Sequence, residues 1–413
     1  MERLAHKAIL IIVVVTCLGT VTAVAETKLT FPAWAGQAQA KAFLDVIEAF
    51  EAANPDVEIE YLQRTGAYYE WIPVLFAAGT PPDVLMVEDR YLRSFVAQGF
   101  IVPIDQYVGT AELKRYFPAA LAPFHFQGAL YGLPRRVNNV ATLYNTELFR
   151  AAGMPYPAAG WTQADLRAYA KKLTTYAPDQ SIAIAGAYFN TPWQQVLPML
   201  WANGGEVFDE EYKTALFDSP ANVATLQYLS DLVNVDRSVN LGQSIRQTFA
   251  IGQTAIWVCQ GAWIVPELRQ TAEIEWDVAP MPAGSAGRAN IVYASAFCVG
   301  SQTKHPEEAV RFVVWASGPE AQRLEAVTPS AVPSIREVAT SRAFLDPGLP
   351  PKGMRVFLEE MEFARPTPQP IRYADVERVV NSYFGQIWRQ TRSGQEGLDE
   401  LQRIVTAILE ESD

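Results

Sequence analysis

The sequence predicts an α/β protein built of lobes that share the chain. Short apolar strands alternate with helical segments along most of its length. Apolar residues make up 49% of the 413 residues, which is enough for a large core, and the length suggests two or three domains. No internal repeat or low-complexity linker divides the chain. We therefore expect the chain to cross between lobes more than once, rather than to form independent domains in series.

Three strand–helix pairs open this pattern. Apolar strands are predicted over 28–34, 57–62 and 84–87, and helical spacing follows them over 41–52, 71–78 and 91–98. Asn54-Pro55, Gly79 and Gly99 end these helices in turn. The first strand runs into a glycine-containing loop at 35–37.

The middle and C-terminal parts continue the alternation. An extended stretch over 131–144 leads to a helix over 148–152 that residues 145–147 cap, and Thr162 is expected to cap another helix with Asp165 at its third position. Later elements are predicted as strands over 254–258, 276–279 and 296–299, a helix over 306–317, and a mainly helical segment over 375–412.

The first 25 residues are typical of an export signal. Basic residues precede an apolar run over 8–18, and Ala23-Val24-Ala25 offers the small-x-small pattern that a signal peptidase needs. The run is shorter than the about 20 residues of a membrane span. We expect an exported protein, periplasmic or extracellular, that begins at Glu26 after cleavage. Two alternatives stay open, a retained N-terminal anchor and a lipoprotein attached at Cys17.

The composition argues against several partners and sites. A net charge of −12 disfavours binding to nucleic acid or to an anionic membrane surface. Three cysteines are too few for a disulfide scaffold; Cys259 and Cys298 are predicted to be buried thiols, with a disulfide between them as the alternative. Three separated histidines make a metal site improbable, and no cofactor is expected.

Seven segments between residues 29 and 410 carry a further pattern through their order and spacing, although each is weak alone. The segments are Phe50-x3-Asn54-Pro55-x-Val57-x-Ile59, Ala77-Ala78-Gly79-Thr80-Pro81-Pro82-Asp83-Val84, Gly99-Phe100-Ile101-Val102-Pro103-Ile104-Asp105, Tyr131-Gly132-Leu133-Pro134 with Tyr144-Asn145-Thr146-Glu147-Leu148-Phe149 and Ala151-Ala152-Gly153-Met154, Asn203-Gly204-Gly205, Gly252-Gln253-Thr254-Ala255 with Gly261-Ala262-Trp263, and Pro306-Glu307-Glu308-Ala309. Together they resemble the family 1 extracellular solute-binding proteins, the sugar-binding components of ABC importers.

This resemblance implies a type II periplasmic-binding-protein fold, in which two α/β lobes enclose a ligand cleft. Lobe 1 would contain residues 26–136 and about 294–336, and lobe 2 about 141–288 and 338–413, with crossings near 136–141, 289–294 and 334–338. A sugar or oligosaccharide would be captured by lobe closure without a change of bonds. The closed form, expected to be a monomer, would deliver its ligand to the permease subunits of a membrane transporter.

A carbohydrate site needs aromatic rings that stack on sugar faces, and charged or amide groups that bond the hydroxyls. Asp89-Arg90 follows the strand over 84–87, where a strand end meets the cleft, and resembles the Asp-Arg hydroxyl clamp of maltose-binding proteins. Gly261 and Trp263 match the family's Gly-x-Trp segment, whose tryptophan stacks on the sugar. The structural alternatives are an exposed helix start for the pair and a core position for the tryptophan.

Further candidates lie in loops and at element ends. They are Trp34 and Gln37 around the first loop, Tyr68 and Tyr69 after the second strand, Asn138 and Arg136 near the first crossing, Trp193 at a helix start, Tyr293 and Arg336 near the later crossings, and Tyr373 as another stacking aromatic. Trp34 could equally fill the core of its lobe.

Two alternatives concern the ligand and the protein class. Arg135 and Arg136 could hold the phosphate of a glycerol-phosphate ester or the charge of another anionic polyol. A secreted carbohydrate-active enzyme would also carry aromatic residues and carboxylates. However, the sequence contains no Gly-x-Ser-x-Gly elbow, His-Glu-x-x-His motif or P-loop. We therefore expect a binding protein and not an enzyme.

Overall fold

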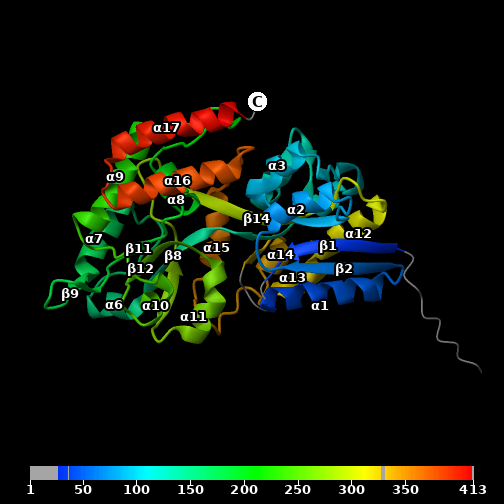
Figure 1. Ribbon diagram of the computed structural model, residues 1–413. Coiled ribbons are helices and arrows are strands. Elements are labelled where there is room, and N and C mark those ends of the chain that lie inside the picture. The colour runs from blue at the N-terminus through cyan, green and yellow to red at the C-terminus, as the bar shows by residue number, and fades with distance from the viewer. Residues whose placement is uncertain (1–26, 36, 327–330, 412–413) are drawn as a thin grey trace, which may run out of the picture.

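Two lobes lie side by side in the computed structural model, which describes residues 27–35, 37–326 and 331–411 (Figure 1). The export segment predicted over 1–25, with Cys17, lies outside the described residues. Each lobe has a mixed sheet covered by helices, and the strand β14 (Asn290–Gly300) runs between the lobes (Figure 1).

Lobe 1 is built around β14 and the first strands of the chain. The parallel strands β1 (Thr27–Trp34) and β2 (Val57–Arg64) lie beside β3 (Val84–Glu88), which pairs with β14 in antiparallel register. The helix α1 (Gln37–Ala53) turns Phe43, Val46, Ile47 and Phe50 into the core, as its apolar spacing predicts. The other elements are α2 (Tyr68–Ala77), α3 (Leu92–Ala97), β4 (Ile101–Val102), α4 (Thr110–Leu113), α5 (Pro118–Leu121), β5 (His125–Phe126), β6 (Ala129–Leu130), β7 (Gly132–Asn138), α12 (Pro306–Ala316), α13 (Pro319–Ala326), β15 (Val332–Pro333) and α14 (Arg336–Ala339).

Lobe 2 contains a four-stranded sheet in the order β11-β12-β8-β13. The strands of this sheet are β8 (Val140–Asn145), β11 (Tyr188–Phe189), β12 (Ile256–Gly261) and β13 (Trp276–Ala279), and β9 (Thr175–Tyr176) pairs with β10 (Ile182–Ile184) in a separate two-stranded sheet. The helices of lobe 2 are α6 (Thr146–Ala151), α7 (Gln163–Leu173), α8 (Trp193–Ala202), α9 (Pro220–Asn234), α10 (Ile245–Ala250), α11 (Val265–Thr271), α15 (Arg355–Glu360), α16 (Tyr373–Trp388) and α17 (Gly394–Glu410).

The chain passes between the lobes at several neighbouring places. β7 ends at Asn138 and β8 begins at Val140, whereas β14 pairs through residues 290–292 with β16 (Ala364–Pro366) and through later residues with β7, β3 and β4. The chain also runs from α14, which contacts β15 and α13, to α15, which contacts β8. The Asn290 side chain accepts from the Val140 amide (3.0 Å) and donates to its carbonyl (2.7 Å), which ties two of these passages together.

Local sequence signals specify several of these elements. Asn145 caps α6, and Thr162 forms a reciprocal capping box with Asp165 at the start of α7, which confirms both predicted caps. The strand predicted over 296–299 is only the end of β14, because Tyr293 and Ser295 interrupt its apolar pattern. Helix α2 starts at Tyr68, earlier than predicted, and this changes the placement of two candidate tyrosines.

The structure also bears on the cysteines. Cys259 and Cys298 are buried free thiols, as predicted, and form no disulfide.

In the part of the chain that the structure describes, no helix combines the length and the apolar composition that a bilayer crossing requires. The described residues also contain no cluster of three or more His, Cys, Asp or Glu side chains suited to a metal ion.

Candidate functional site

A cavity of about 1210 Å³ lies between the two lobes. Lobe 1 contributes the end of β1, the first turns of α1, the 3-10 helix η1 (Asp89–Tyr91) and α13. Lobe 2 contributes the starts of α8, α11 and α16, while β7 and β14 contribute residues where they pass between the lobes. The volume exceeds the range of about 300–1000 Å³ that is usual for small-ligand pockets. A ligand here would touch both lobes at once.

The pair Asp89-Arg90 lines this cavity directly after β3. Glu88 holds the Arg90 guanidinium in an ion pair of 2.5 Å. Asp89 is 1% exposed, and its burial raises its pKa to about 7, although Arg90 and a hydrogen bond with Thr367 act in the opposite direction. Asp89 therefore places a carboxyl group at the cavity wall, in surroundings that disfavour the ionised form of this group.

Removing this carboxyl group should make the protein more stable at neutral pH. Since the folded-state pKa of Asp89 lies above its ordinary value, its protonated form favours the fold at low pH, and this contribution is lost as the pH rises through about 7. Asp89→Asn keeps the shape without the charge. The unfolding free energy of Asp89→Asn minus that of the unchanged protein should increase by roughly 2–3 kcal/mol as the pH rises from about 5 to about 8.

Urea unfolding of the ligand-free proteins at several pH values measures this difference. Asp399→Asn, which removes an exposed carboxylate from α17, is the matched control. If the unfolding free energies of Asp89→Asn and of the unchanged protein differed by the same amount at every pH, the prediction would be wrong.

Trp263 lines the lobe 2 side of the cavity, in a short 3-10 helix (Ala262–Ile264) after β12. Its ring meets the Tyr293 ring edge to face, with centroids 5.8 Å apart. Gly261 lies directly under the ring, and a Cβ atom at this position would overlap it. Only glycine therefore allows the indole to lie in this orientation, and Gly261 positions Trp263 without lining the cavity itself.

The strands that pass between the lobes supply Asn138, Tyr293 and Arg136. Asn138 and Tyr293 are register partners across β7 and β14, so their side chains lie on the same face of the sheet. Burial, and then the neighbouring Arg135, lower the pKa of Arg136 to about 10. Arg135 is ion-paired with Glu325 (2.6 Å) and lies over the Phe43 ring (4.2 Å).

Unsatisfied polar atoms gather on the cavity-lining residues. Within the described residues, six of these side chains have a buried atom without a hydrogen-bond partner: Trp34 Nε1, Asp89 Oδ2, Arg90 Nε, Asn138 Oδ1, Gln195 Oε1 and the Tyr293 hydroxyl. A buried polar group without a partner costs free energy. A ligand rich in hydroxyl groups could supply both the donors and the acceptors that this set lacks.

Other candidates lie away from the cavity. The Tyr68 hydroxyl donates to the Pro32 carbonyl (3.2 Å) and accepts from the Met86 amide (3.2 Å), inside lobe 1. Tyr69 accepts from the Glu88 amide (3.0 Å) and stacks on Tyr91. Because α2 starts at Tyr68, both rings belong to a helix that packs inward and not to a cleft loop.

Trp193 and Tyr373 support the cavity wall from behind. Trp193 is fully buried at the start of α8, and Tyr373 is 1% exposed. The Tyr373 hydroxyl accepts a hydrogen bond from the Gln194 side chain and donates one to Glu377. Gln194 and Glu377 line the cavity, and Tyr373 does not. Gln37 begins α1, but its side chain is outside those that the structure describes.

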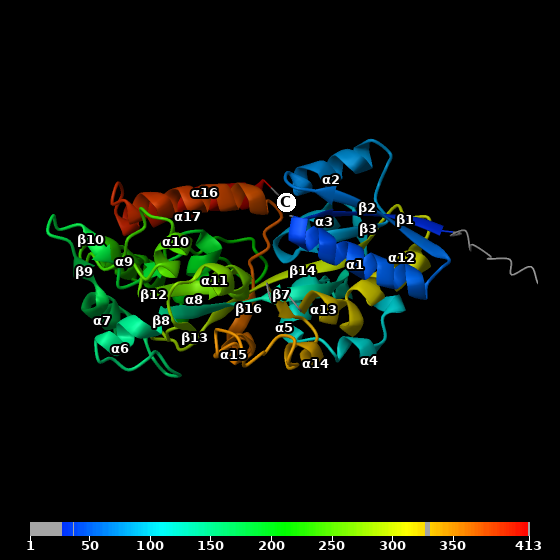
Figure 2. The same ribbon diagram turned by 90° about the horizontal axis from the view of Figure 1, so that it is seen from below.

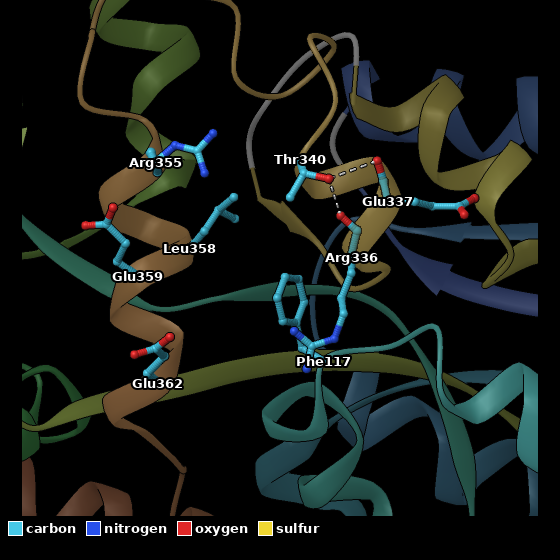
Figure 3. Close-up of a pocket in the computed structure, with 8 residues that line it drawn as sticks. All are labelled: Phe117, Arg336, Glu337, Thr340, Arg355, Leu358, Glu359 and Glu362. Carbon is cyan, nitrogen blue, oxygen red and sulfur yellow. Dashed lines mark hydrogen bonds between the residues drawn. The ribbon is translucent and has the colours of Figure 1, made fainter.

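Arg336 lies in a separate pocket of about 450 Å³ between α14 and α15. Its guanidinium covers the Phe117 ring (4.7 Å), opposite Arg355 and Leu358 of α15 (Figure 3). The two helices lie on the side of the molecule opposite α2 and α16 (Figure 2). Asn138 lines the cavity, whereas the next side chain, Asn139, donates to the Phe357 carbonyl of α15 (2.7 Å). Asn139, between β7 and β8, thus reaches α15 instead of the cavity, and Arg336 lies on this α15 side of the crossing strands.

Sequence reasoning missed several lining residues. They include Lys41, Asp45, Gln194, Gln195, Glu267, Gln322, Glu325 and Glu377. Gln194 and Gln195 directly follow the candidate Trp193, so the amide pair at this helix start was an available signal. The others come from helices far apart in the sequence, and no local motif marks them.

Known proteins resemble this chain in sequence. The family described as bacterial extracellular solute-binding protein matches residues 34–323. Putative binding proteins of Brucella abortus and Brucella suis are 25% identical over 275 residues, which is 65% of this chain and 66% of theirs. The chain is thus matched to just under two thirds of their length. A maltotriose-binding protein of Pyrococcus abyssi is 24% identical over 311 residues, 72% of this chain and 64% of its own.

Solved structures match the fold over most of the chain. An ABC substrate-binding protein of Listeria monocytogenes, in complex with cycloalternan, aligns with a TM-score of 0.82 at 23% identity, over 93% of this chain and 99% of its own. A cyclic α-maltosyl-1,6-maltose binding protein of Arthrobacter globiformis aligns with a TM-score of 0.81 at 20% identity, with the same coverage. These likenesses confirm the two-lobed α/β fold predicted from the sequence.

Proposed function

The chain belongs to the bacterial extracellular solute-binding proteins, and on this premise we propose that it captures a neutral sugar or oligosaccharide between its lobes. The observation that carries the proposal is the set of unsatisfied polar atoms on residues that line one cavity together with Trp263. Sugars combine apolar ring faces with many hydroxyl groups, and this cavity offers an aromatic ring and hydrogen-bonding groups together. Relatives named for maltotriose, arabinooligosaccharide and galactooligosaccharide binding support the same ligand class.

The charges of the cavity favour a neutral ligand over a phosphate ester. Its walls carry the carboxylates Asp45, Glu88, Asp89, Glu267, Glu325 and Glu377 and the cations Lys41, Arg90, Arg135 and Arg136. Lys41, Arg90 and Arg135 are ion-paired with Asp45, Glu88 and Glu325, and Arg136 also interacts with neighbouring groups. An anionic polyol would have to compete with these carboxylates for each cation.

Capture proceeds by closure of the lobes and leaves the ligand's bonds intact. A ligand that contacts both lobes binds the closed arrangement more tightly than the open one, so it shifts the population toward closure. The closed monomer then delivers the ligand to the permease subunits of an ABC transporter. Export to the periplasm or the extracellular space, and the predicted lobe boundaries, are part of this proposal.

Calorimetric titration against a panel of neutral saccharides, glycerol phosphate and uronates tests this proposal. We expect one neutral saccharide to bind one-to-one with a negative heat-capacity change, and mass spectrometry to recover it unchanged. Tighter binding of glycerol phosphate would replace the ligand class by the anionic alternative. Conversion of the saccharide into a product would replace the binding protein by an enzyme.

A further inference from the structure

A short segment of lobe 1, residues 89–93, touches lobe 2 through aromatic and cationic side chains. Tyr91 meets Tyr373 edge to face with ring centroids 5.5 Å apart, and the Arg90 guanidinium lies 5.9 Å from the same ring. Tyr373 belongs to α16 of lobe 2. The segment that supplies Asp89 to the cavity thus also holds the two lobes together.

The third contact of this segment lies outside the cavity and is made by Arg93 of α3. Its guanidinium lies between two rings, 4.9 Å from the Phe126 centroid in lobe 1 and 4.4 Å from the Tyr212 centroid in lobe 2. Arg93 makes no ion pair within the described residues. Burial lowers the pKa of Arg93, so the cation has lost part of its hydration. A desolvated cation between two aromatic faces is attracted more strongly than an exposed one.

The lobe 2 loop at 209–214 is shaped to present Tyr212. The Asp209 carboxylate accepts from the amides of Lys213 (2.8 Å) and Thr214 (3.1 Å), which closes the loop into a tight turn. Tyr212 adopts a φ of 58°, a left-handed conformation that costs a non-glycine residue free energy. The loop nevertheless places the tyrosine ring against Arg93 of the opposite lobe.

The Tyr212 ring is linked to the ligand cavity through lobe 2. Tyr212 packs on Phe208 (5.8 Å), Phe208 on Trp193 (6.3 Å), and Trp193 on Tyr373 (6.2 Å). In lobe 1, Arg93 follows Asp89 and Arg90 after about one helical turn. Movement of α3 away from the loop at 209–214 would therefore shift the cavity wall as well.

We propose that Arg93 and Tyr212 form an interlobe latch that sets ligand affinity without touching the ligand. The latch raises the fraction of ligand-free molecules that adopt the arrangement seen here, in which both lobes line one cavity, so the ligand has to drive less closure. An apparent dissociation constant equals the intrinsic one divided by the fraction of molecules in the binding-competent state. The effect on affinity rests on the proposed function, whereas the hold on the lobes does not.

Two single variants and one matched control test the latch. Arg93→Met removes the charge but keeps most of the stem, and Tyr212→Leu removes the ring from the other lobe. Arg237→Met breaks a cation–π pair of the same kind inside lobe 2, where Arg237 lies over Tyr176 (5.4 Å). Melting curves first establish that each variant is folded. Having one variant in each lobe keeps the test usable if the other fails to fold.

Small-angle scattering of the ligand-free proteins gives the first readout. Both latch variants should show a larger radius of gyration than the unchanged protein, and faster hydrogen exchange over residues 207–215, while Arg237→Met should match the unchanged protein in radius. With the best saccharide of the panel, each latch variant should bind about three- to tenfold more weakly. The double variant should bind no more weakly than either single one, because both break the same contact.

An unchanged radius of gyration in both latch variants would overturn the latch, as would additive losses of affinity in the double variant. The scattering readout needs no ligand. If the unchanged protein binds no saccharide, the proposed function fails, while the radius of the ligand-free variants still decides whether Arg93 and Tyr212 hold the lobes.

Discussion

Replacing Trp263 by alanine is expected to weaken saccharide binding about 30-fold or more, which corresponds to roughly 2 kcal/mol. The indole is half-buried at the cavity, held between Gly261 and Tyr293, and offers a flat apolar surface that can cover a sugar ring. Truncation removes this surface and leaves water against the sugar face. Calorimetric titration with the tightest saccharide of the panel measures the loss.

A second half-buried tryptophan provides the control for this prediction. Trp71 lies on α2 of lobe 1, outside the cavity, with the Arg64 guanidinium 5.1 Å from its ring. Trp71→Ala should change saccharide affinity less than twofold, even if it lowers the melting temperature more than Trp263→Ala does. Equal affinities for Trp263→Ala and the unchanged protein would remove Trp263 from the binding site.

Replacing Glu360 by alanine is expected to lower the free energy of unfolding by about 3–5 kcal/mol. Glu360 is fully buried in α15, where it is ion-paired with Arg288 and accepts from the Asn290 side chain (2.5 Å) and the Met281 amide (3.2 Å). Burial raises the pKa of this carboxyl group, against the effect of Arg288. Alanine would leave the Arg288 charge and these donors without their shared partner.

Glu359 and a glutamine variant separate this effect from a general change in α15. Glu359 is the exposed neighbour on the same helix, so Glu359→Ala should change the unfolding free energy little. Glu360→Gln keeps the volume and one acceptor, and should be less destabilised than Glu360→Ala. Urea unfolding gives all three values. If Glu360→Ala were no less stable than Glu359→Ala, the contacts of Glu360 with Arg288, Asn290 and Met281 would not stabilise the fold.

Local sequence patterns were sufficient to predict the alternation of strands and helices, and to predict those cavity residues that lie in or beside a motif. Asp89 and Arg90 line the cavity as expected for residues that directly follow a strand at the cleft. Trp263, which the Gly261-Ala262-Trp263 segment marked as a candidate, lines the same cavity. Tyr68 and Tyr69 were expected in a loop, but α2 starts early enough to turn both inward. Arg336 lies outside this cavity, in the separate pocket between α14 and α15.

The remaining part of the cavity depends on tertiary packing. Glu377 and Glu325 reach the cavity from helices that lie far from Asp89 in the sequence. Periodicity marks which face of such a helix is apolar, but not which polar side chain faces a partner lobe. The contact between Arg93 and Tyr212 is of the same kind, because it joins residues of different lobes.

A crystal structure of the protein with the tightest-binding saccharide tests the central claim most directly. We expect the sugar to lie between the lobes, with a ring face on Trp263 and hydroxyl groups hydrogen-bonded to Asp89 and Arg90. A saccharide bound outside this cavity, or touching one lobe alone, would contradict capture by lobe closure.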